Sequence, residues 1–129
     1  AAEGPGRHRH GVRLVSGLDA GVVTDALAVD LAHEPLPAEV VRAGAPTTGI
    51  RELGAFRDVE LGIWEMSEGA AVDTEADEVF IVLAGAACVD FIEPVLPSIE
   101  VRAGSVVRLT EGMRTLWTVR ETLRKVYIA

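Results

Sequence analysis

Short apolar segments recur from residue 50 to the end of the chain, and glycine, proline or acidic turns separate them. Each segment is rich in Val, Ile, Leu or aromatic residues, as β-strands are. The expected strands are residues 59–66, 79–83, 86–92, 99–102, 105–109, 115–119 and 122–128. Closely spaced short strands are typical of antiparallel sandwiches and barrels, so the pattern predicts an all-β fold.

Residue parity predicts which side chains share a face of these strands, because successive side chains point to opposite sides. One face carries Glu78, Phe80 and Val82, and one face of a later strand carries Thr115, Trp117 and Val119. These two faces are the expected lining of a barrel interior.

A helix over Asp73 to Leu83 is an alternative, since Thr74 and Asp77 resemble a capping pair. The run Val79-Phe-Ile-Val82 is rich in β-forming residues and is followed by Ala-Gly-Ala, which favours a strand that glycine ends.

The first third of the chain is less regular. Residues 1–11 are rich in Gly, Pro, Arg and His, and we expect a mobile arm outside the fold. Val12–Val15 and Ala26–Leu31 are apolar enough for short strands, and the second segment equally suits one or two helical turns. We expect residues 12–129 to form a single domain.

Length and charge narrow the classes of function. With 129 residues, 49% of them hydrophobic, the chain suits one self-standing domain. Its net charge of −8 and scattered basic residues argue against a nucleic-acid partner. No apolar run approaches the ~20 residues of a membrane span, and the N-terminal residues do not resemble a signal peptide. We therefore expect a cytoplasmic protein without a membrane partner.

The chain has a single cysteine, Cys88, which excludes an intrachain disulfide and a multi-cysteine zinc site. It lies in an apolar segment without a neighbouring histidine, so we expect a small buried side chain rather than a reactive thiol.

Two spacings in the barrel-like part are informative. Glu78 is followed by six residues and then Gly85; Gly104 is followed by five residues, then Thr110, Glu111 and Gly112, with Thr115 and Val119 further on. These spacings resemble the two motifs of the cupin superfamily. The resemblance implies a double-stranded β-helix, the RmlC-like jelly roll or cupin barrel, and covers about residues 36–129. The glycines have their own physical reading, because strand corners often require a positive φ or a close backbone approach.

A closer resemblance is to small single-domain cupins related to (S)-ureidoglycine aminohydrolase. The similar segments are Gly62-Ile-Trp64-Glu65, Ser67-Glu68-Gly69, Asp77-Glu78-Val-Phe and Trp117-Thr-Val-Arg-Glu-Thr-Leu-Arg-Lys125-Val-Tyr127.

In metal-binding cupins, the first motif supplies two His and a Glu, and the second supplies a third His. The resemblance places these positions at Val72, Thr74, Glu78 and Thr115, so only Glu78 is a competent ligand. The three histidines, His8, His10 and His33, all precede the barrel-like part. We therefore predict no metal and no other cofactor, and no metal-dependent catalysis of the family's usual kind.

An oxygen-only site is the remaining metal hypothesis. The acidic group Asp73, Glu75, Asp77 and Glu78 would suit Ca²⁺ or Mg²⁺. The simpler interpretation is a solvated acidic turn from which Glu78 alone points inward.

The predicted ligand pocket consists of Trp64, Glu78, Phe80, Thr115, Trp117 and Tyr127. In the alternative, these side chains only fill the interior of a small barrel. A glutamate there needs a partner, for which Lys125 and Arg108 are candidates, and Glu78 is also the candidate catalytic residue.

Three hypotheses of function follow. The first is a small-molecule-binding or structural homodimer without the three-His/Glu metal site. The second is an enzyme acting on a small nitrogenous or carboxylated metabolite of the ureidoglycine kind, with an atypical metal site. The third is a subunit that pairs through an exposed strand, with residues 12–33 exchanged onto its partner. The sequence does not name the ligand.

Overall fold

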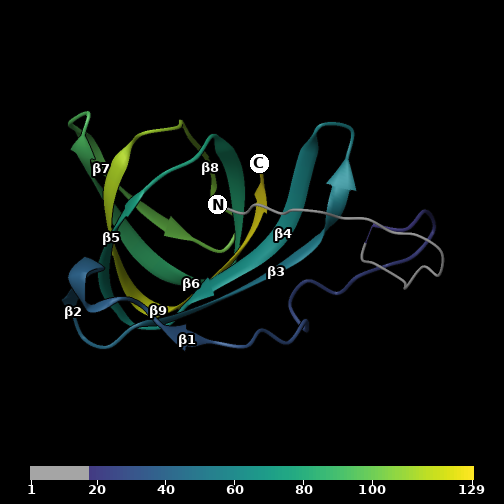
Figure 1. Ribbon diagram of the computed structural model, residues 1–129, viewed down its shortest axis with the longest axis horizontal. Coiled ribbons are helices and arrows are strands. Elements are labelled where there is room, and N and C mark those ends of the chain that lie inside the picture. The colour runs from purple at the N-terminus through teal and green to yellow at the C-terminus, as the bar shows by residue number, and fades with distance from the viewer. Residues whose placement is uncertain (1–17) are drawn as a thin grey trace.

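The two longest strands, β6 (Glu78–Glu93) and β9 (Arg114–Ile128), pair with each other along almost their whole lengths. The computed structural model describes residues 18–129. Four other strands join the outer edges of this pair directly, and three more extend the sheet beyond them (Figure 1). The remaining elements are β1 (Glu34–Pro35), the 3₁₀ turn η1 (Ala38–Val40), β2 (Val41–Ala43), β3 (Thr47–Phe56), β4 (Val59–Met66), β5 (Gly69–Thr74), β7 (Leu96–Arg102) and β8 (Val106–Leu109).

The sheet curls into the predicted double-stranded β-helix, or jelly-roll barrel (Figure 1). On one edge of β9, β5 pairs with its first half and β4 with its second half. On the outer edge of β6, β8 pairs with the first half and β7 with the second half. All these pairings are antiparallel. The bent pair of β6 and β9 therefore provides the central strands of both halves of the barrel.

The sequence pattern was wrong about the number of strands in this central pair. It divided β6 into residues 79–83 and 86–92, and β9 into residues 115–119 and 122–128. In the structure, Gly85 bends β6 without ending it, and the register with β9 shifts on both sides of the bend. Gly85 has a φ of 96°, and a Cβ atom there would lie 2.1 Å from the backbone oxygen of Thr122. Only glycine permits the two backbones to pass this closely.

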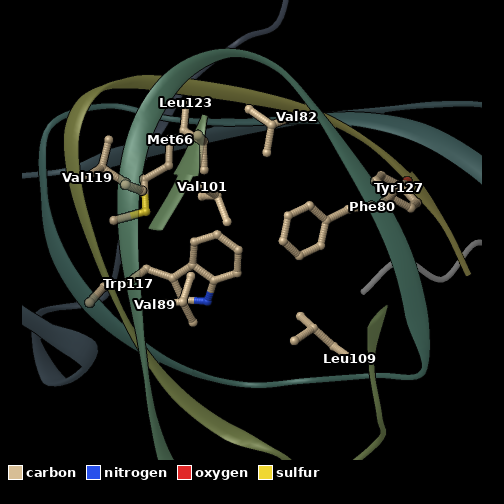
Figure 2. Packing of buried hydrophobic residues seen from close by; sticks show 12 residues of the cluster. Met66, Phe80, Val82, Val89, Val101, Leu109, Trp117, Val119, Leu123 and Tyr127 are labelled. Atoms are coloured by element: carbon tan, nitrogen blue, oxygen red, sulfur yellow. The ribbon is translucent and has the colours of Figure 1, made fainter. Parts of the chain in front are cut away.

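The predicted faces are confirmed, because all six side chains assigned to the interior are buried. Phe80 and Trp117 lie in the middle of the core, with Tyr127 beside Phe80 (Figure 2). The ring centroids of Phe80 and Trp117 are 5.5 Å apart and tilted, a favourable arrangement for aromatic rings. The strand interpretation of residues 78–83 is also confirmed, which rules out the helix.

Gly104 and Gly112 lie in turns and have the positive φ angles expected where strands turn corners. Their φ angles are 94° and 90°, and a Cβ atom at either position would meet nothing within 4 Å. These glycines therefore serve backbone conformation alone.

Residues 18–33 contain neither of the elements predicted for Ala26–Leu31. Arg124 of β9 instead donates hydrogen bonds of 2.9 Å to the carbonyl oxygens of Ala26 and Val29. These carbonyls are thus satisfied by a side chain rather than by a neighbouring strand. Val12–Val15, His8 and His10 lie outside the described residues.

Glu65 of β4 completes the attachment of this segment. Its carboxylate accepts a 2.9 Å hydrogen bond from Arg124 Nε and lies 2.7 Å from His33 Nε2. Burial by itself raises the pKa of Glu65, but the bonds from Arg124 and His33 outweigh it and hold the pKa below its ordinary value. His33 also lies 2.7 Å from the hydroxyl of Thr47, so it bridges the segment to β3 and β4.

No helix within residues 18–129 has the length and apolar character that crossing a membrane requires.

The bend at Gly85 gives a first prediction. Gly104→Ala strains only a positive φ and should lower the free energy of unfolding by roughly 1–2 kcal/mol. Gly85→Ala adds a backbone clash to the same strain and should lower it by at least ~3 kcal/mol. Urea unfolding of both variants measures the difference, and equal losses would contradict the close approach of β6 and β9.

Candidate functional site

A buried ion pair lies inside the barrel. Nζ of Lys125, on β9, is 2.9 Å from Oε2 of Glu78, the first residue of β6, and each side chain is only 6% exposed. Arg108, the other partner considered from the sequence, is exposed and lies 3.6 Å from Asp77 instead. Lys125, the only lysine of the chain, therefore neutralises Glu78.

Three aromatic rings surround the Lys125 ammonium. Nζ lies 4.2 Å from the ring centroid of Phe80, 4.7 Å from that of Trp64 and 4.8 Å from that of Trp117. Trp64 is directly opposite Lys125 in the pairing of β4 with β9, so the sheet register sets this contact. Cation–π attraction of this kind is strongest away from water and offsets part of the desolvation of the charge.

Glu75, in the turn between β5 and β6, is a second buried carboxylate and is only 7% exposed. Its Oε2 accepts hydrogen bonds from the hydroxyl of Thr115 at 2.6 Å and from the indole N–H of Trp117 at 3.0 Å. Backbone bonds with Gly112 and Met113 fix the same turn to the β8–β9 loop.

The sequence interpretation of a solvated turn with Glu78 alone inward was therefore wrong about Glu75. A signal was present in the sequence. Trp117 was expected inside the barrel, and a buried indole N–H needs an acceptor. Nothing in the spacing of the chain, however, showed which carboxylate supplied it.

Two adjacent spaces lie beside these groups. An inner chamber of about 40 Å³ is lined by Ile50, Trp64, Asp73, Glu75, Glu78, Trp117, Lys125 and Tyr127. An outer cleft of about 820 Å³ is lined by Ala32, Glu34, Pro35, Leu36, Pro37, Val40, Thr48, Gly49, Ile50, Trp64, Met66, Ala71, Val72, Asp73 and Trp117. The two spaces share Ile50, Trp64, Asp73 and Trp117 in their walls, so they lie next to each other.

Asp73 stands at the junction of the two spaces. The residue is exposed, but its carboxyl lies against the wall of the two spaces. Desolvation there raises the pKa of Asp73 to about 6, and the nearby charge of Glu75 adds to the effect. The backbone N–H of Thr74 donates to it at 2.8 Å, and Lys125 also acts in the opposite direction. Asp73 therefore changes charge near neutral pH.

The structure brings all six residues of the predicted ligand pocket together. Trp64, Glu78, Trp117 and Tyr127 line the chamber. Phe80 lies behind them against the Lys125 ammonium, and Thr115 lies behind them against Glu75. Whether this chamber holds a ligand stays a prediction.

The segment Gly62-Ile-Trp64-Glu65 has a structural explanation. Gly62 leaves room for the ring of Tyr127, since a Cβ atom there would lie 2.2 Å from its hydroxyl oxygen. Trp64 packs on Lys125, while Glu65 points away to Arg124. One strand thus serves the chamber and the attachment of residues 18–33.

The side chains do not fit the usual cupin metal site. Val72 and Thr74 cannot serve as the histidine pair, and Thr115 is hydrogen-bonded to Glu75. Glu78 is paired with an ammonium group. Within residues 18–129 no three His, Cys, Asp or Glu side chains are grouped so as to hold a metal ion, and the acidic turn is no exception.

Cys88 differs from its predicted environment, because it is only partly buried. It faces the outer side of β6, where its thiol lies 3.8 Å from Asp90 Oδ1 and its backbone pairs with Glu100. Burial and the adjacent Glu100 and Asp90 raise the pKa of the thiol, which disfavours the reactive thiolate.

Residues 53–127, more than half of the chain, match the family described as the EutQ-like cupin domain. The protein belongs to this cupin family. The match confirms the resemblance to the cupin superfamily but gives no support to the closer likeness to ureidoglycine aminohydrolase. Among functionally curated proteins, none matches the sequence of this EutQ-like cupin.

Solved structures show the same fold. A Salmonella typhimurium protein assigned as ethanolamine utilization protein Q is 21% identical, with a TM-score of 0.54 over 64% of this chain and 68% of its own. A Pseudomonas syringae protein of unknown function is 20% identical, with a TM-score of 0.66 over 83% of this chain and 46% of its own. Ectoine synthase from P. lautus is 14% identical, with a TM-score of 0.55 over 63% and 62%. At such identities the likeness concerns the fold alone.

The ion pair gives the second prediction. Lys125→Met leaves Glu78 buried without a counter-charge and should lower the free energy of unfolding by about 3–5 kcal/mol. The double variant with Glu78→Gln removes both charges and should recover most of that loss. Urea unfolding of the single and double variants tests this, and a double variant less stable than Lys125→Met would contradict a coupled pair.

Asp73 gives the third prediction. Its folded-state pKa of about 6 lies above the ordinary value of 3.8, so the folded protein binds this proton more tightly. The resulting stability is present below pH ~4 and is lost as the pH rises through 6. Asp73→Asn should therefore lose less stability than the wild-type protein between pH 4 and pH 7, by under ~1 kcal/mol because the residue is exposed.

Urea midpoints at several pH values measure this difference. Asp58→Asn, in the turn between β3 and β4, is the matched control and should follow the wild-type profile. A parallel profile for Asp73→Asn would show that its carboxyl does not titrate in this range.

Proposed function

We propose that this EutQ-like cupin binds a small organic molecule in the outer cleft, with one end of the molecule in the inner chamber. The observation that supports this most directly is the pair of adjacent spaces that share Trp64 and Trp117 in their walls. A concave site with mostly apolar walls and a few converging polar groups is the usual form of a small-molecule site. The outer cleft combines apolar side chains such as Leu36, Val40 and Met66 with the carboxylate of Asp73.

The alternative that residues such as Trp64 and Trp117 only fill the barrel interior is less well supported. A filled interior would leave no room beside these rings, whereas both of them line open space. Trp64 is partly exposed, so part of its ring faces solvent-filled volume.

Binding is also better supported than metal-dependent turnover of a nitrogenous or carboxylated metabolite. That chemistry needs a polarising ion beside Glu78, yet the group beside Glu78 is the ammonium of Lys125. A metal ion there would have to displace a cation that is already held by three aromatic rings.

A homodimer remains part of this proposal. Exposed apolar side chains at the β6–β7 turn, among them Val95 and Leu96, support it. Exchange of residues 12–33 finds no such support, because in residues 18–33 Ala26, Val29 and His33 bind the same chain. A cytoplasmic location stays a prediction.

The fourth prediction tests binding by tryptophan fluorescence, since Trp64 and Trp117 are the only tryptophans and both line the spaces. A panel of small amines, carboxylates, ureas and alcohols should contain members that change the emission saturably. Ile50→Ser removes apolar wall at a half-exposed position and should weaken such binding roughly five- to tenfold.

Val106→Ser makes the same kind of change on β8, outside the cleft, and should leave binding unchanged. If no compound in the panel changes the emission, or if both variants weaken binding equally, the cleft is not the binding site.

A further inference from the structure

We propose that the ligand of the cleft is an organic cation, an amine with an apolar body, whose nitrogen lies in the inner chamber against the carboxylate of Glu75. This inference rests on the proposed function, because it names the chemical class of the molecule that the cleft binds.

The charges around the two spaces favour a cation. The chamber has three carboxylates, Asp73, Glu75 and Glu78, and a single ammonium, that of Lys125. Lys125 is paired with Glu78 at 2.9 Å, so Glu75 and Asp73 lack a basic partner among residues 18–129. The charged side chains that line the outer cleft, Glu34 and Asp73, are both acidic. The net charge of −8 attracts a cation over longer distances as well.

Glu75 is the part of the site that most requires an external partner. It is 93% buried, since only 7% of its surface is exposed, and its Oε2 is bonded by the neutral donors of Thr115 and Trp117. The hydrogen bonds from residues 18–129 reach Oε2 alone, and the other oxygen, Oε1, is not a buried atom, so it is open to an external donor. The ammonium of Lys125 in the same chamber is paired with Glu78, so Glu75 itself is bonded only by neutral donors. A ligand ammonium would supply Glu75 with a positive charge and with donors for Oε1.

The dimensions of the site determine where the parts of the ligand lie. A chamber of about 40 Å³, above the ~10–15 Å³ that a cavity needs to hold one water, has room for a small head group such as an ammonium. The cleft, at about 820 Å³, offers Ile50, Leu36, Met66 and the Trp64 ring to an apolar body. The ring of Trp64 would also attract a cation that approaches through the cleft.

Asp73 supports the same assignment. Burial and the neighbouring charge of Glu75 raise its pKa to about 6, which is the response of a carboxyl in a wall that is short of positive charge. An anionic ligand would add a further negative charge to this wall, and a neutral one would leave it uncompensated.

The test uses four probes with the whole protein: n-butylamine, n-butanol, butyrate and tetramethylammonium. Tryptophan fluorescence and calorimetry at pH 7.5 should show butylamine binding at least tenfold more tightly than butanol, with butyrate weakest. Tetramethylammonium should bind less tightly than butylamine, because four methyl groups exceed the chamber and leave no N–H for Oε1.

Two variants test whether the ligand's positive charge lies against Glu75. Glu75→Gln keeps an acceptor for Thr115 and Trp117, and it should weaken butylamine binding at least tenfold while changing butanol binding less than twofold. Glu68→Gln removes an exposed carboxylate in the turn between β4 and β5 and should leave both affinities unchanged. If Glu75→Gln does not fold, Asp73→Asn takes its place, because Asp73 is exposed. This variant should weaken butylamine binding about threefold and leave butanol binding unchanged.

The outcomes separate the two proposals. Butanol or butyrate binding as tightly as butylamine would overturn the cation while leaving the cleft a binding site. Unaltered butylamine binding in Glu75→Gln, or in its substitute Asp73→Asn, would do the same. If neither the probes nor the metabolite panel binds, the proposed function fails, and the inference fails with it.

Discussion

The ion pair between Lys125 and Glu78 is the interaction on which the barrel interior depends. Two opposite charges are removed from water here, which a protein tolerates only when geometry and further contacts compensate. The compensation comes from Trp64 on β4, Phe80 on β6 and Trp117 on β9, so it exists only when the three strands are in register. The pair thus couples the two longest strands to β4 and makes their alignment a condition of stability.

This ion pair also gives physical meaning to the altered cupin motif. In a metal-binding relative, a divalent ion would sit beside the glutamate, held by imidazoles. Here the positive charge at that glutamate is covalently part of the chain, and aromatic faces take the place of additional ligands. The barrel keeps a buried cation, and Val72 and Thr115 occupy the positions that the sequence resemblance assigns to metal ligands. In this cupin barrel, a lysine rather than a metal ion therefore compensates the charge of the buried glutamate.

Much of the fold followed from the sequence because it depends on local patterns. Alternation predicted the inward faces of β6 and β9, and Gly104 and Gly112 marked corners through their backbone freedom alone. Gly85 was harder, because its role is a close approach to Thr122, 37 positions later, which no local pattern records. The same reason explains the error over Ala26–Leu31, whose conformation is set by a distant arginine, Arg124.

The candidate site was predictable in part. Parity and family spacing brought together aromatic residues and Glu78, and the need of a buried carboxylate for a partner led to Lys125 as one of two options. Choosing between Lys125 and Arg108 required the three-dimensional register. The burial of Glu75 could not be predicted. Side chains in a turn do not alternate between two faces, and this burial depends on contacts with the β8–β9 loop.

The bare backbone at Gly62 has a consequence for selectivity. Tyr127 lies where it does because β4 offers it space, and Tyr127 in turn forms part of the chamber wall. The volume open to a head group is therefore determined by an absent side chain on a neighbouring strand, at a position that does not line the chamber. Relatives could diverge in the molecules they accept through a single methyl group at this position, with every residue of the chamber wall unchanged.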